Sequence, residues 1–108
     1  MLELREYLEA GAVSPFRTWF DKLDATAAAK VTAALTRLEQ GNLSNVKSVG
    51  GGVLEHRIDF GPGYRVYLGR DGDTLVMLLA GGTKKRQQRD IDAAKARWVD
   101  YKRRKRQE

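Results

Sequence analysis

Hydrophobic positions recur at helical spacing in the first third of the chain. Ser14-Pro15 is typical of a helix start, because serine caps the first turn and proline fits the first helical position. The apolar residues that follow at helical spacing are Phe16, Trp19, Phe20 and Leu23. Before them, apolar residues alternate with charged ones over residues 2–8 and Gly11 ends the run, which predicts a first strand.

A second helical stripe begins after Asp24, a residue type that favours helix N-termini. Its members are Val31, Leu35 and Leu38, and Gly41-Asn42 ends the pattern. The two stripes together predict a helical hairpin over roughly residues 15–40. The segment 42–52 is polar and glycine-rich, and its Gly50-Gly51-Gly52 run is expected to be a flexible connection into the sheet.

From Val53 onwards the pattern changes to the alternation that is typical of strands. Three such runs occupy residues 53–60, 64–70 and 74–80. Gly61-Pro62-Gly63 predicts a short hairpin loop between the first two runs, and Asp71-Gly72 predicts a two-residue turn before the third. The sequence therefore predicts a three-strand antiparallel meander.

Pairing the first hairpin across its three-residue loop divides the meander into two faces. Ile58 then lies opposite Val66 and His56 opposite Leu68 on a core face, to which the turn adds Leu75, Met77 and Leu79. On the other face Asp59 lies opposite Arg65 and Arg57 opposite Tyr67, with Glu55, Val76 and Leu78 nearby. This second face is expected to be charged and partly sheltered.

The last part of the chain is strongly basic. Gly81-Gly82 is expected to end the third meander strand, and Lys84-Lys85-Arg86 follows at the exit of the sheet. A final helix from about Gln88 carries Ile91, Ala94, Trp98 and Tyr101 on one face and runs into a basic tail over residues 102–108.

Composition limits the function classes that fit this chain. Its 108 residues suit one domain spanning 1–108, with no cysteine and a single histidine, so thiolate chemistry and histidine-rich metal sites are excluded. No apolar run approaches the length of a membrane span and no signal pattern opens the chain, so we expect a cytoplasmic protein. Residues 1–46 have a net charge of −1 and residues 47–108 of +7, which favours a polyanionic partner for the second part.

The order of strand, helical hairpin, meander and C-terminal helix resembles the RelE/ParE superfamily of bacterial toxins, and most closely its HigB-like, phage-derived "addiction module killer" branch. Three short motifs carry the resemblance: Leu54-Glu55-His56-Arg57-Ile58, Gly63-Tyr64-Arg65-Val66-Tyr67, and Gly81-Gly82-Thr83-Lys84-Lys85 leading to Gln88, Asp90 and Ile91. The resemblance implies an α+β RelE-like fold with a small, twisted, mainly antiparallel sheet. It also implies the toxin of a type II toxin–antitoxin pair, usually a ribosome-dependent mRNA endoribonuclease neutralised by a helix-turn-helix antitoxin.

In RelE-like toxins the basic residues of the sheet face carry catalysis, and the resemblance assigns that role here to Arg57, Arg65 and Lys84 or Lys85. The alternative role of Arg65 is purely structural, in an ion pair with Asp59 across the strands. No metal and no cofactor are implied. The basic residues supply charge stabilisation for attack of a 2′-hydroxyl on its phosphate, a reaction that also needs two proton transfers.

The acid–base residues are less well defined by the sequence. RelE has a tyrosine where this chain has Ile91, so Glu55, Tyr101 and His56 are the candidates, and the register favours a packed His56. Tyr67 could stack on an RNA base or pack across strands. Further RNA contacts are expected from Arg86, Lys102, Arg103 and Arg104, unless the tail is a frayed, solvated terminus.

Two other functions fit the same fold. A ParE-type toxin poisons DNA gyrase by binding a protein, and such a toxin has less need of a basic sheet face. A non-catalytic module that binds RNA or an antitoxin is the second alternative. We expect an oligomer, if one forms, to be mediated by the antitoxin.

Overall fold

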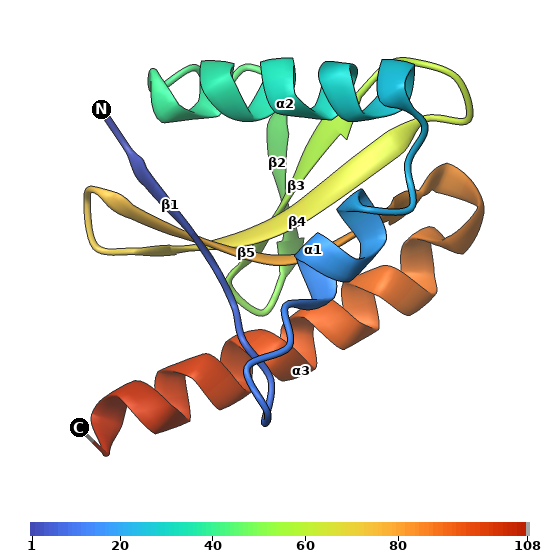
Figure 1. Ribbon diagram of the computed structural model, residues 1–108. Helices are drawn as coiled ribbons and strands as arrows, with labels where there is room; N and C mark the ends of the chain where they lie inside the picture. The colour runs from blue at the N-terminus through green and yellow to red at the C-terminus, as the bar shows by residue number, and fades with distance from the viewer. Residues whose placement is uncertain (108) are drawn as a thin grey trace.

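Five strands form one sheet in the order β1-β5-β4-β3-β2 (Figure 1). Their bounds are β1 (Glu3–Glu6), β2 (Val46–Gly50), β3 (Val53–Ile58), β4 (Tyr64–Asp71) and β5 (Leu75–Thr83). β1 pairs with β5 in parallel, and all other neighbours are antiparallel. This computed structural model describes residues 1–107 and confirms the α+β fold class.

Strand β2 lies in the polar segment 42–52, in which the sequence predicted no strand, so the prediction for this segment was incomplete. Val46–Gly50 pairs with β3 as an edge strand, so the sheet has five strands rather than about four. A register shift between Ser48 and Gly50 interrupts the pairing. Val46 and Val49, the apolar residues of this strand, pack on opposite faces of the sheet, so the segment shows no two-residue apolar alternation.

Two helices cover one face of the sheet. These are α1 (Pro15–Phe20) and α2 (Ala25–Glu39), and their expected caps are confirmed. Ser14 Oγ accepts a hydrogen bond from the Arg17 N–H at 3.0 Å, and Asp24 Oδ1 accepts one from the Ala27 N–H at 2.8 Å. α1 is short and packs mainly against β5, so the pair is a less clear hairpin than the sequence predicted.

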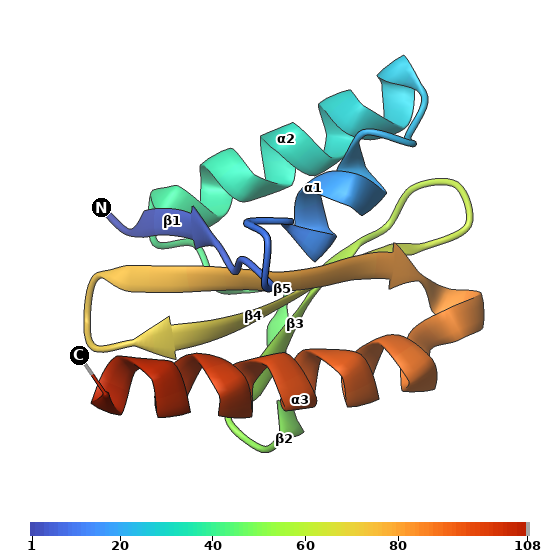
Figure 2. The same cartoon turned by 60° about the horizontal axis from the view of Figure 1, so that its bottom comes forward.

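The C-terminal helix covers the opposite face, as Figure 2 shows. The 3-10 turn η1 (Lys84–Arg86) leads from β5 into α3 (Gln87–Arg106). Ile91, Ala94 and Trp98 are buried as expected, and they pack on the face that carries Tyr67. Residues 102–106 belong to α3 rather than to a frayed tail. The face predicted to be charged and partly sheltered is therefore a second core.

The strand registers differ from the predicted ones in two ways. β3 pairs with β4 across a five-residue loop, Ile58 opposite Tyr64, so every predicted pair moves by two positions and each side chain keeps its face. β4 pairs with β5 across a three-residue loop, Asp71 opposite Leu75, instead of a two-residue turn. This odd shift reverses β5: Leu75, Met77 and Leu79 lie under α3, and Val76 and Leu78 lie under α1 and α2.

Gly81 and Gly82 continue β5 instead of ending it. Gly82 pairs with Arg65, and the strand runs to Thr83. A Cβ at Gly81 would lie far inside van der Waals contact with the Trp19 ring, and one at Gly82 would do the same with the Asp90 carboxylate. Glycine is needed here for close approach rather than for a turn. Within residues 1–107 no helix is both long and apolar enough to cross a membrane.

Candidate functional site

A buried carboxylate organises the α3-covered face of the sheet. The Glu55 side chain on β3 has no exposed surface. Its Oε1 lies 3.3 Å from Arg57 Nε, 3.8 Å from Arg65 Nε and 3.9 Å from Lys47 Nζ. Its Oε2 accepts a hydrogen bond from Gln87 Nε2, at the start of α3, at 2.7 Å. We refer to these five residues as the Glu55 cluster.

Strand pairing explains why the Glu55 cluster forms. Lys47 pairs with Glu55 across β2 and β3, and Arg57 pairs with Arg65 across β3 and β4, so all four side chains point to the same face. A buried carboxylate is strongly unfavourable unless cations and hydrogen bonds compensate it. Three cations around one carboxylate leave a net charge of +2 at this end of the sheet.

Arg65 connects this cluster to a pocket of about 360 Å³ at the sheet edge. The loop between β3 and β4 forms most of the wall, and the lining residues are Asp59, Phe60, Gly61, Pro62, Gly63, Arg65 and Lys84. Lys84 is held there because its backbone N–H donates to the Gly63 carbonyl at 2.9 Å. We call this the Arg65 pocket.

The charges around the Arg65 pocket differ in their exposure. Arg65 is 6% exposed, and its Nη1 donates to the Tyr64 carbonyl at 3.2 Å. Arg57 is 44% exposed in its side chain, and Lys84 is also exposed. Asp59 is an exposed carboxylate on the pocket wall. The predicted pair between Asp59 and Arg65 does not form, because Ile58, not Phe60, is the residue opposite Tyr64, and Arg65 instead pairs with Glu55.

Two further polar side chains lie beneath α3 next to the cluster. Tyr67 is fully buried, and its pKa is raised by burial and then by the neighbouring Glu55 charge. Burial also raises the pKa of Asp90, although Arg86, Arg89 and Arg97 oppose that shift. The Tyr67 hydroxyl, Asp90 Oδ2 and Arg65 Nε have no hydrogen-bond partner within residues 1–107. Because Tyr67 is enclosed, it has no free ring face for an RNA base, which corrects the stacking prediction.

His56 lies on the other face of the sheet, among the residues packed beneath α2. It is 3% exposed, and burial, together with the charge of Arg37, lowers its pKa. Neither ring nitrogen has a hydrogen-bond partner in the described part of the chain. The structure therefore places His56 in a packed environment away from the Arg65 pocket.

The remaining predicted site residues lie at the far end of α3. Tyr101 donates a hydrogen bond to Asp71 Oδ2 at 2.5 Å, and Asp71 is six residues along β4 from Arg65, roughly 20 Å away. Lys102, Arg103 and Arg104 follow Tyr101 on the same helix. By contrast, Lys85 and Arg86 are exposed in η1, next to Lys84. The structure thus brings together Arg57, Arg65 and the η1 cations, and separates Tyr101 from them.

Sequence reasoning missed four residues of this region: Lys47, Asp59 as a pocket residue, Gln87 and Asp90. Lys47 was missed because its strand was missed. A signal for Asp90 exists in Gly82, since a glycine inside a strand often marks the close approach of another element. Among residues 1–107 no group of three or more His, Cys, Asp or Glu side chains is arranged to hold a metal ion.

Comparison with known proteins assigns the chain to a family. Residues 18–99, which include the Glu55 cluster and the Arg65 pocket, match the model of the phage-derived Gp49-like proteins (DUF891). The chain belongs to this family. A Haemophilus influenzae protein whose name assigns no function is 48% identical over 81 residues, which cover 74% of this chain and 82% of that protein. The Gp49-like family is associated with the toxins of toxin–antitoxin systems.

Proposed function

We propose that this Gp49-like chain is a HigB-like toxin of a type II toxin–antitoxin pair and that it cuts mRNA in the ribosome. The Arg65 pocket is the observation that carries the proposal. There a guanidinium fixed by a buried carboxylate lies beside an exposed lysine and an exposed aspartate. A site that must bind a phosphodiester and stabilise added negative charge needs such an arrangement.

The proposed reaction is attack of an RNA 2′-hydroxyl on the adjacent phosphorus. The O2′–P bond forms and the P–O5′ bond breaks, which leaves a 2′,3′-cyclic phosphate and a 5′-hydroxyl. Arg65 and Lys84 stabilise the charge on the phosphoryl oxygens, and Arg57 binds a neighbouring phosphate. Asp59 accepts the 2′-hydroxyl proton, and the Lys84 ammonium donates a proton to the leaving 5′ oxygen.

Glu55 has a positioning role in this proposal. With no exposed surface and both oxygens engaged, it cannot touch a substrate. Its charge instead holds Arg57 and Arg65 in fixed directions, so that less reorganisation is needed when RNA binds. The proton acceptor is therefore Asp59 on the pocket wall rather than Glu55.

The proposed partner is a helix-turn-helix antitoxin that neutralises the chain. A small helix-turn-helix protein encoded beside this gene, able to restore growth when co-expressed, would support this assignment. Co-expression that leaves the growth arrest unchanged would contradict it.

The nuclease proposal is tested by induced expression in bacteria followed by mapping of mRNA ends. Lys84→Ala should lower cleavage by about 10²–10³, the usual cost of removing one donor to a developing negative charge. Lys85→Ala is the matched control, because Lys85 has the same charge one position away and does not line the pocket. Asp59→Asn should reduce cleavage with the fold intact.

Three results would contradict the proposal. Growth arrest with intact transcripts and trapped gyrase–DNA complexes would instead support a gyrase poison. Equal cleavage by the Lys84→Ala and Lys85→Ala variants would exclude the Arg65 pocket as the active site. Absence of both arrest and cleavage would exclude a toxin.

A further inference from the structure

A second basic pocket lies between the end of β4 and the last turns of α3. It has a volume of about 430 Å³, and its charged lining residues are Arg70, Asp71, Lys102, Lys105 and Arg106. The rings of Trp98 and Tyr101, stacked at 5.3 Å between centroids, form the apolar part of its wall. We call it the C-terminal basic pocket.

The cations of this pocket outnumber its acids. Asp71 is the acidic residue of the lining. Its carboxylate forms an ion pair with Lys105 Nζ at 2.5 Å and accepts a hydrogen bond from the Tyr101 hydroxyl at 2.5 Å. Lys102 lies over the Trp98 ring at 5.6 Å. Lys102, Arg106 and Arg70 form no ion pair within residues 1–107; Arg70 donates to the Asp73 carbonyl. Four cations and one carboxylate give the pocket a net charge of +3.

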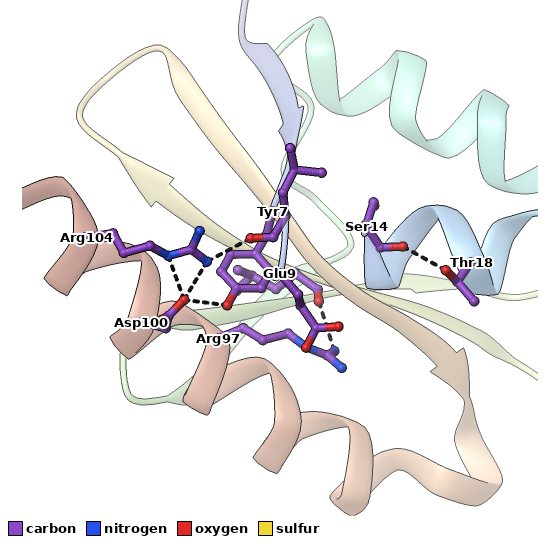
Figure 3. Close-up of polar contacts among 9 residues, drawn as sticks. Tyr7, Glu9, Ser14, Thr18, Arg97, Asp100 and Arg104 are labelled. Atoms are coloured by element: carbon purple, nitrogen blue, oxygen red, sulfur yellow. Dashed lines mark hydrogen bonds and ion pairs between the residues drawn. The ribbon is translucent and has the colours of Figure 1, made fainter. Parts of the chain in front are cut away.

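The other side of the same helix shows the opposite arrangement. Asp100 pairs with both Arg103 and Arg104 and accepts a hydrogen bond from the Tyr7 hydroxyl at 2.6 Å. Arg104 also donates to the Leu8 carbonyl at 2.8 Å, and Figure 3 shows Asp100 in contact with both the Arg104 guanidinium and the Tyr7 hydroxyl. Asp100 and Arg104 thus fasten α3 to the residues that follow β1. The basic run of residues 102–106 is divided into a side on which Arg103 and Arg104 pair with Asp100 and a side on which Lys102, Lys105 and Arg106 line the pocket.

The partial negative charge at the C-terminus of α3 balances only part of the net positive charge of the pocket. Basic residues in the last turn complement the partial negative charge at a helix C-terminus, about half an elementary charge. Three charges in excess of the pocket's carboxylate exceed that requirement. Arg70 also lies on β4, not on the helix, and faces the same pocket.

We propose that the C-terminal basic pocket binds the phosphates of an RNA backbone and anchors RNA away from the Arg65 pocket. This proposal rests on the proposed function, in which RNA is the substrate. Arg70 is five residues along β4 from Arg65, roughly 17 Å, so one RNA strand of several nucleotides can contact both pockets. Contacts to phosphates position an RNA without selecting its sequence.

The test measures binding of the full chain to a fluorescent 20-nucleotide 2′-O-methyl RNA. The methyl group blocks the attacking hydroxyl, so binding is measured without cleavage. Lys102→Gln/Arg106→Gln should weaken binding about tenfold at low salt. It should also reduce the magnitude of the slope of log K against log salt by about 1.4, since each lost single-strand phosphate contact removes about 0.7.

Lys22→Gln/Lys30→Gln is the matched control. It removes two exposed cations as well, both from the part of the chain that forms α1 and α2, and lowers the net charge from +6 to +4 in the same way. Its affinity should stay within twofold of wild type. Glutamine retains helix propensity, and circular dichroism melting confirms that both variants fold.

Equal weakening in both double variants would overturn the proposal, because net charge alone would then explain binding. An unchanged affinity of Lys102→Gln/Arg106→Gln would also overturn it. The proposal would also be overturned if Lys102→Gln/Arg106→Gln lost binding to anionic phospholipid vesicles while its RNA affinity stayed unchanged. The pocket would then be a lipid-binding site. Retained RNA binding through this pocket by a chain that cuts no mRNA would support the anchor and contradict the nuclease proposal.

Discussion

The two faces of the sheet are built from different chemistry. Under α1 and α2 the packing residues are apolar, apart from His56. Under α3 the apolar contacts of Trp98 and its neighbours share the interior with Glu55, Arg65 and the Asp90 carboxylate. Burial of charge is unfavourable for folding unless it is compensated, so a face that retains it has a requirement besides stability. We infer that the first face specifies the fold and that the second holds the cations of the proposed active site.

Removal of the Glu55 carboxylate should cause the largest loss of stability on the α3-covered face. Glu55→Ala leaves Arg65 buried without its carboxylate, and loss of one partner of a buried charge cluster costs about 3–5 kcal/mol. Urea unfolding measures this loss.

Glu3→Ala is the control for Glu55→Ala. Its pair with Arg5 has side chains 57% and 61% exposed, and such pairs contribute about 0–1 kcal/mol. Equal losses in the two variants would mean that Glu55 is not an organising charge.

The adjacent glycines Gly81 and Gly82 test the two faces separately, because Gly81 lies against Trp19 of α1 and Gly82 against Asp90 of α3. Gly81→Ala forces a Cβ into the packed Trp19 ring and should cost about 1–3 kcal/mol, the usual cost of overpacking. Gly82→Ala displaces the Asp90 carboxylate, which can rotate away, so its loss should be smaller.

A double-mutant cycle checks this assignment by thermal unfolding. Asp90→Ala should suppress most of the cost of Gly82→Ala, because the clashing atoms are gone. It should leave the cost of Gly81→Ala unchanged. Additive effects of Gly82→Ala and Asp90→Ala would show that the two residues do not compete for one space.

Strong local signals account for the parts of the fold that could be predicted. Ser14 and Asp24 mark helix starts through hydrogen bonds made within three residues, so no tertiary information is needed. The face of each residue in β3 and β4 was also predictable, because alternation survives a two-residue register error. β2 was not predictable, since its apolar residues Val46 and Val49 pack on opposite faces of the sheet. The orientation of β5 was not predictable either, since one extra loop residue reverses it.

The candidate site was predictable in its cations but not in its surroundings. Arg57 and Arg65 share a face by alternation alone. That α3 closes over this face and buries Tyr67 depends on Trp98 fitting against Gly69, where a Cβ would overlap the indole ring. Such long-range fit leaves no periodic signal in the sequence, and Asp90 was missed for the same reason.

Neutralisation of Asp90 should change how the free energy of unfolding depends on pH, because its carboxylate is buried on the α3-covered face. Burial raises the pKa of this carboxyl, so its contribution to stability is present at low pH and is lost as pH rises through the folded-state pKa. Asp90→Asn should therefore increase the free energy of unfolding at pH 7, with a difference that vanishes below about pH 4. Asp92→Asn, an exposed change on the same helix, is the control. A pH-independent effect of Asp90→Asn would exclude buried charge as the cause.

His56 gives the smallest expected effect and tests the apolar face. Burial lowers the pKa of its imidazole, so wild-type stability is full above the unfolded value of about 6.5 and falls as pH drops towards the folded value. His56→Leu removes two unpartnered nitrogens and should stabilise the fold by about 1 kcal/mol at pH 8, with no loss below pH 6.5. Urea unfolding at pH 8 and pH 5 measures both effects. Because the apolar face holds no catalytic group in this proposal, the His56→Leu variant should also retain toxicity. A His56→Leu variant that folds but is not toxic would show that the apolar face also contributes to the activity.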